Sequence, residues 1–200
     1  MFSFFIGKMT SDKIILGIDP GTTIMGYGLI SFKKNAGVKK GQSGLELITL
    51  GVLHLSKLDD HALKLKKIFE RTLALIDEYK PDELAIEAPF FGKNIQSMLK
   101  LGRAQGVAMA AALHRTIPIF EYSPKRIKQS ITGNGNASKE QVAAMLQALL
   151  NFNELPKHLD ATDGLAAAVC HSFQKGKLEN GEKSYTGWKA FLTENPNRKA

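Results

Sequence analysis

The N-terminal part of the chain alternates between apolar runs and short polar interruptions, a pattern that predicts three β-strands. Residues 14–19 are apolar as far as Asp19 and predict a buried strand. Pro20-Gly21 then marks a turn, and residues 25–32 predict the antiparallel partner of a hairpin. Residues 33–44 form a polar, basic loop, and residues 45–55 predict a third strand. These segments together indicate an antiparallel meander.

Beyond the meander, helical patterns alternate with short buried strands. A long helix is predicted from about Asp59 to Tyr79, and Pro81 ends it. Residues 83–87 (ELAIE) and 117–122 (IPIFEY) predict two short strands, with a helix over residues 94–114 between them. The meander and these later strands would form one mixed sheet.

The helix predicted at residues 94–114 has one face without bulky side chains, because Gly102, Gly106 and Ala110 recur at intervals of four. Another backbone can pack closely on such a face. We expect the face to pack against the protein's own sheet, and a dimer interface is the alternative.

Three helices are predicted after the fifth strand. The first begins with Ser123 as its cap and Pro124 at its first position, and the last spans residues 159–173. Between them, residues 138–141 (SKEQ) form a capping box that opens a helix. The residues of this helix that we expect to face inward are Val142, Met145, Leu146 and Leu149. The prediction is therefore an α/β fold in which a mixed five-stranded sheet is flanked by helices.

The size and composition of the chain suit one globular domain. It has 200 residues, of which 44% are hydrophobic. We expect the domain at residues 14–173, after an N-terminal extension at 1–13 and before a polar, flexible C-terminal tail at 174–200. No apolar run approaches the length of a membrane span, and a single cysteine, Cys170, fits a reducing cytoplasm.

A net charge of +8 favours a polyanionic partner, with nucleic acid ahead of a membrane surface. Lys125, Arg126, Lys128 and Lys139 flank the flexible turn GNGN and are candidates for phosphate contacts. Lys93 could line the same groove. The alternative for all of these residues is an ordinary solvated surface.

Four acidic residues lie at the ends of predicted elements. Asp19 ends the first strand and Glu87 the fourth, while Asp160 and Asp163 lie about 60° apart around the last helix. If these elements meet, the carboxylates repel one another unless cations neutralise them. Oxygen ligands suit Mg²⁺ or Mn²⁺, and two such ions about 4 Å apart can support phosphodiester hydrolysis. Taken singly, each acid could equally be a solvated residue or complement a helix dipole.

Aromatic and histidine side chains lie close to these acids in the sequence. Phe90 and Phe91 follow Glu87, and we expect Phe90 to be exposed for stacking on bases and Phe91 to lie in the core. His158 and His171 flank the acid pair, and an ordinary surface or core position is expected for both.

Two alternatives to a nuclease remain open at this point. The segment GIDPGTT is similar to the first phosphate loop of the actin, heat-shock chaperone and sugar-kinase ATPases, although no second loop is found here. A DNA-binding module without catalysis is the other alternative. Four placed acids argue against that module, because carboxylates without cations repel phosphate.

Five segments carry further information: ILGIDPGTTIMGYGLI, LAIEAPFFGKN, LKLGRAQGVAMAAAL, FEYSPKRIKQSITGNGNASKEQV and DATDGLAAAVCH. As a set, in this order over residues 14–173, they resemble the RuvC family of crossover (Holliday) junction endodeoxyribonucleases. The resemblance implies a ribonuclease H-like fold and an active homodimer. It also implies symmetric nicking of a four-way DNA junction with two Mg²⁺ ions per site, for which Mn²⁺ could substitute.

The resemblance also implies roles for particular residues. The family's catalytic and metal-binding carboxylates fall on Asp19, Glu87, Asp160 and Asp163. Its aromatic residue near the crossover falls on Phe90, and its basic residues near the scissile strand fall on Lys128 and Lys139. The implied partner is a RuvA–RuvB branch-migration complex.

Overall fold

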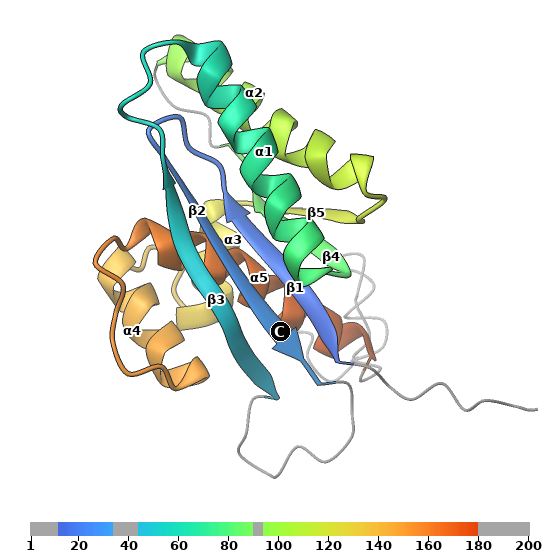
Figure 1. Cartoon of the computed structure of the whole chain (residues 1–200). Helices are drawn as coiled ribbons and strands as arrows, with labels where there is room; N and C mark the ends of the chain where they lie inside the picture. Colours follow the sequence, from blue (N-terminus) through green and yellow to red (C-terminus); the bar gives the residue numbers. More distant parts are fainter. Residues whose placement is uncertain (1–11, 34–43, 90–93, 180–200) are drawn as a thin grey trace, which may run out of the picture.

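A mixed five-stranded sheet lies between two layers of helices in the computed structural model, which describes residues 12–33, 44–89 and 94–179 (Figure 1). The strand order is β3-β2-β1-β4-β5. The strands are β1 (Lys13–Asp19), β2 (Ile24–Phe32), β3 (Leu45–His54), β4 (Glu83–Glu87) and β5 (Ile119–Tyr122).

Two helices cover one face of this sheet and three cover the other (Figure 1). The first layer contains α1 (His61–Tyr79) and α2 (Ile95–His114). The second layer contains α3 (Pro124–Thr132), α4 (Lys139–Leu150) and α5 (Asp160–Glu179). The predicted α/β architecture is therefore confirmed.

The pairing of the strands decides which residues share an edge of the sheet. Antiparallel pairs join β1 to β2 and β2 to β3, which confirms the meander. Strand β4 runs parallel to β1 on one side and to β5 on the other. Because parallel strands end at the same edge, Asp19 and Glu87 are brought to that edge together.

Alternating side chains divide the core between the two faces of the sheet. Leu16, Ile18 and Ile86 pack beneath α1 and α2, while Ile15 and Ala85 pack against the second layer. By this alternation, the residues that end β1 and β4 project toward the face covered by α5.

Helix α5 lies very close to the sheet because glycines replace larger side chains at the contact. A Cβ atom at Gly28 would lie 2.6 Å from the Cα of Leu165, and one at Gly17 would lie 2.1 Å from the carbonyl oxygen of Gly164. A Cβ atom at Gly26 would lie 1.9 Å from the carbonyl oxygen of Asp160. Gly164 on α5 belongs to the same contact, because a Cβ atom there would lie against the backbone of Gly26 and Tyr27.

The predicted helix starts are observed at their caps. The Ser123 hydroxyl accepts from the amide of Arg126, and Pro124 stands at the first position of α3. At α4 the capping box is complete, since Ser138 and Gln141 each bond the backbone of the other. These caps fix where α3 and α4 begin, and they thereby fix the positions of Lys128 on α3 and Lys139 on α4.

The structure departs from the predictions at three helices. Met145 is 47% exposed rather than inward, because α4 packs through a face centred between Val142 and Ala143. Helix α5 continues to Glu179, beyond the predicted end at residue 173. On α2 the small-residue face does not pack on the sheet, because a Cβ at Gly102 or Gly106 meets nothing within 4 Å.

None of the helices in the described ranges combines the length and apolarity needed to cross a membrane.

We expect Gly28→Ala to lower the free energy of unfolding by about 1–3 kcal/mol, because its methyl group would be forced against the backbone of Leu165. Urea denaturation measures this change. Lys66→Ala on α1 is the control, since this side chain is exposed, forms a surface ion pair with Glu70, and its loss should change the free energy of unfolding by less than about 0.5 kcal/mol. Equal stability of the two variants would contradict the close-packing account.

Candidate active site

Two of the predicted acids are carried by neighbouring strand ends. Asp19 ends β1 and Glu87 ends β4, and both face α5. The turn after Asp19 leads directly back into β2, and a Cβ at Gly21 would lie 1.8 Å from the carbonyl oxygen of Ile24. Glycine is therefore required for the turn that follows this carboxylate.

The other two acids lie in the first turn of α5. Asp163 immediately precedes Gly164. A Cβ atom added at Gly164 would lie only 2.6 Å from the Cα of Tyr27. This contact holds the start of the helix against β2. The side chain of Asp163 is 17% exposed and that of Asp160 is 36% exposed, so Asp160 lies nearer the solvent.

A cavity of about 210 Å³ opens between these elements. Three of the four predicted acids, Asp19, Glu87 and Asp163, line it together with Lys128 and Lys139. The remaining lining residues are Pro124, Ile127, Val142 and Ala166. Charged groups from β1, β4, α3, α4 and α5 thus meet in one apolar-walled hollow.

Burial and mutual repulsion make these carboxylates hard to ionise. Burial, followed by the charges of Glu87 and Asp163, holds the pKa of Asp19 well above its usual value. Burial and Asp163 raise the pKa of Glu87 to about 7. Burial also raises the pKa of Asp163, although Lys139 opposes this shift. The cluster therefore lacks enough positive charge to stabilise all its acids in ionised form.

Lys139 supplies part of the missing charge. Its Nζ lies 2.6 Å from Oδ2 of Asp163 and 3.1 Å from Oδ1 of Asp160, so one ammonium bridges both acids of α5. Burial disfavours its charge, but the bonds to Asp163 and Asp160 outweigh burial and raise the pKa of Lys139. The sequence predicted a phosphate contact for this residue, and the structure places it among the carboxylates.

The donor set fits a hard divalent cation. The acids offer only oxygen ligands, and their raised pKa values reflect a need for positive charge. Within the described residues, however, no three Asp, Glu, His or Cys side chains are already gathered closely enough to hold one ion. The cluster would have to tighten around a cation.

The other predicted DNA-contacting residues lie outside this hollow or outside the described residues. Arg126 bonds the Oε1 atom of Gln174 on α5, and Lys125 extends past Gly135. Phe90 and Lys93 fall in the segment 90–93, which lies outside the described residues.

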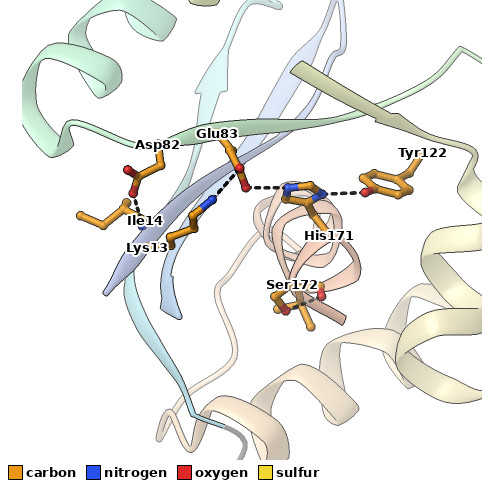
Figure 2. A network of polar contacts seen from close by, with 8 residues as sticks. Lys13, Ile14, Asp82, Glu83, Tyr122, His171 and Ser172 are labelled. Carbon is orange, nitrogen blue, oxygen red and sulfur yellow. Dashed lines mark hydrogen bonds and ion pairs between the residues drawn. The ribbon is translucent and has the colours of Figure 1, made fainter. Parts of the chain in front are cut away.

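A buried polar network ties α5 to the sheet and was not identified from the sequence (Figure 2). His171, 1% exposed, lies between Glu83 on β4 and Tyr122 on β5, with Nε2 2.9 Å from Oε2 of Glu83. Its Nδ1 lies 2.6 Å from the Tyr122 hydroxyl, and Lys13 donates to the other oxygen of Glu83. A histidine at the end of an apolar run was the available signal, and from it the sequence predicts only an ordinary surface or core position.

A second buried contact reaches the strand end of Glu87 from the opposite face. The amide nitrogen of Gln105 on α2 lies 2.8 Å from Oε2 of Glu121 and 3.5 Å from the Glu87 carbonyl oxygen. Gln105 is 7% exposed. The end of β4 is therefore supported from both layers of helices.

Comparison with known proteins identifies the family. The sequence profile described as "Crossover junction endodeoxyribonuclease RuvC" matches residues 15–171. The chain is 66% identical over 190 residues to the protein of that name from Christiangramia forsetii, covering 95% of this chain and 94% of that protein. The corresponding protein of Bacteroides fragilis is 60% identical over 189 residues, with coverage of 94% and 96%.

Solved structures agree with the sequence relatives. "T. thermophilus RuvC in complex with Holliday junction substrate" is similar with a TM-score of 0.72 and 29% identity, over 82% of this chain and 94% of that chain. The yeast mitochondrial Holliday junction resolvase Ydc2 shares the fold, with a TM-score of 0.57 and 15% identity over 83% and 82%. The chain therefore belongs to the RuvC family of crossover junction endodeoxyribonucleases, phosphodiester hydrolases that resolve Holliday junctions.

Proposed function

We propose that Asp19, Glu87, Asp160 and Asp163 are the catalytic carboxylates of this nuclease and that they hold divalent metal ions. The observation that carries the proposal is the shared cavity, in which three of these acids meet and in which burial, followed by the charges of neighbouring acids, raises the pKa values of Asp19 and Glu87. Acids that served only as solvated surface groups would be expected to point away from one another into solvent, and these acids instead share an apolar-walled hollow. A cluster of this kind is stable in ionised form only beside cations.

Mg²⁺ is the expected metal, with two ions per site and Mn²⁺ as a substitute. When bound, the metal ions supply a nucleophilic water and stabilise charge on the phosphate and leaving oxygens. The protein's own part is to hold the carboxylates on rigid elements. Strand ends provide Asp19 and Glu87, and the first turn of α5 provides Asp160 and Asp163.

The basic residues around the cavity are proposed to hold the DNA backbone of a four-way junction. Lys128 lines the cavity beside the acids, and Lys125 and Arg126 extend the positive charge along α3. Phe90 and Lys93, which follow Glu87 in the sequence, are expected to contact the DNA as well. The crossover DNA in the solved structure of the Thermus thermophilus relative supports this choice of substrate.

The exposed face of α2 is proposed as the contact between two copies of the chain. Ile95, Leu99 and Leu113 are 70%, 52% and 64% exposed. Gly102 and Gly106 lie between Leu99 and Leu113, and the five residues follow one another at spacings of four, three, four and seven, which place them on one side of the helix as in a packed helix pair. Two copies with one acid cluster each would cleave the junction symmetrically.

Family membership also supports two expectations about the cellular setting. A RuvA–RuvB branch-migration complex is the expected partner, and the cytoplasm is the expected location. A single buried thiol, Cys170, is consistent with a reducing compartment.

Each of Asp19→Asn, Glu87→Gln, Asp160→Asn and Asp163→Asn should lower the rate of junction cleavage by more than about 100-fold, because each removes a metal ligand. Junction binding should persist. Cleavage of a synthetic four-way junction in Mg²⁺, with EDTA in parallel, measures the effect. Glu70→Gln is the matched control, because this exposed acid lies on α1. Near-normal cleavage by any one acid variant would remove that residue from the proposed set.

Glu87→Gln should stabilise the metal-free protein at pH 8 by about 1–3 kcal/mol while leaving stability near pH 4 unchanged. The pKa of Glu87 rises from 4.5 to about 7 on folding, so the folded state retains a proton that the unfolded chain releases. The free energy of unfolding of the unsubstituted protein therefore falls as the pH rises from 4.5 to about 7. Thermal unfolding in EDTA from pH 4 to 8 tests the difference, and a constant gap across that range would contradict it.

Leu99→Asp should convert the dimer to monomers, because a charge would enter the helix contact. Sedimentation velocity measures the oligomeric state, and paired symmetric nicks should become single nicks. Met145→Asp is the control, since Met145 is similarly exposed, at 47%, but lies on α4 in the other layer. A Leu99→Asp variant that remains dimeric would assign the interface to another surface.

A further inference from the structure

The ammonium of Lys139 occupies a place in the acid cluster where a divalent cation would be expected. It bridges Asp160 and Asp163 at 3.1 Å and 2.6 Å from a position at the first residue of α4. The bridged oxygens belong to two of the four proposed metal ligands. A cation that uses them must compete with this ammonium or displace it.

Lys128 provides a direct comparison within the same cavity. It also lines the hollow and draws Glu87 and Asp163 toward their ionised forms. Within the described ranges of the chain, however, Lys128 makes no ion pair, whereas Lys139 makes two. The two lysines therefore share a charge and a location but differ in contact with the acids.

The exposed fractions of the side chains indicate which partner of these ion pairs can move away. The side chain of Lys139 is 50% exposed, whereas that of Asp163 is 17% exposed and is anchored on the close-packed start of α5. A long, half-exposed side chain can change rotamer at little cost, while the helix cannot move without losing its contact with the sheet. Exchange would therefore proceed by movement of the lysine.

We propose that Lys139 is the internal counter-cation of this active site, which neutralises Asp160 and Asp163 before metal loading and is displaced when a divalent ion binds. The inference rests on the proposed function, because it requires these acids to be metal ligands. Displacement leaves the ammonium at the rim of the cavity, where the DNA phosphate would lie. Metal binding and phosphate contact by Lys139 are thereby coupled.

Lys139 would lower the affinity for metal in the absence of DNA, and removing it should raise that affinity. We expect Lys139→Met to bind Mg²⁺ on the order of 10-fold more tightly than the unsubstituted protein, within the usual range of coupling between two ligands. Lys139→Arg should remain within about 3-fold, because it keeps the charge and the ion pairs. Isothermal titration calorimetry with MgCl₂ and no DNA measures these affinities.

Lys128→Met is the matched control, because it removes the same charge from the same cavity without breaking an ion pair. Its Mg²⁺ affinity should rise less than that of Lys139→Met. Thermal unfolding gives an independent readout. In EDTA at pH 8, Lys139→Met should be less stable than Lys128→Met, and saturating Mg²⁺ should close the gap.

The outcomes separate the two proposals. If Lys139→Met binds Mg²⁺ no more tightly than Lys128→Met, Lys139 is a DNA-contacting residue only and the exchange is wrong, even though Mg²⁺-dependent cleavage persists. If the unsubstituted protein neither binds Mg²⁺ nor cleaves a junction with it, the proposed metal-dependent function itself fails. Tighter binding by Lys139→Met alone supports the exchange.

Discussion

The close contact of α5 with strands β1 and β2 is the constraint on which the rest of the molecule depends. Glycines on the strands and on the helix leave no room for a Cβ atom at the contact, so the backbones themselves meet. Without this approach, Asp163 could not reach the edge where Asp19 and Glu87 end their strands. The buried Glu83–His171–Tyr122 network holds the same helix farther along its length (Figure 2). Packing and polar contacts thus position one helix for chemistry.

The same closeness creates the electrostatic problem of the site. Carboxylates pressed together in a hollow are stable when protonated or beside cations, and their raised pKa values express that requirement. Lys139 answers it in part by bridging two of the acids. The site is therefore less stable than a simple core would be, as is common where function requires buried charge. Family membership identifies the chain as a nuclease and removes the nucleotide-binding alternative.

The two faces of the sheet carry separate tasks. The layer of α3, α4 and α5 builds the charged hollow, while α1 and α2 form the opposite layer (Figure 1). The outer face of α2 retains exposed leucine and isoleucine side chains, and its inner face sends Gln105 to the end of β4. One helix therefore adjoins both the proposed dimer contact and the strand end of Glu87.

The sequence by itself determined the elements, the strand meander, the helix caps and the four acids at element ends. Hydrophobic period, capping residues and turn glycines are local signals, so they can be read without the fold. Only the tertiary structure decided that the small-residue face of α2 points away from the sheet and that Met145 is exposed. It also decided that Lys139 contacts Asp160 and Asp163. It also decided the partners of His171. These features depend on which elements meet, and contacts between residues far apart in the chain leave no periodic pattern in the sequence.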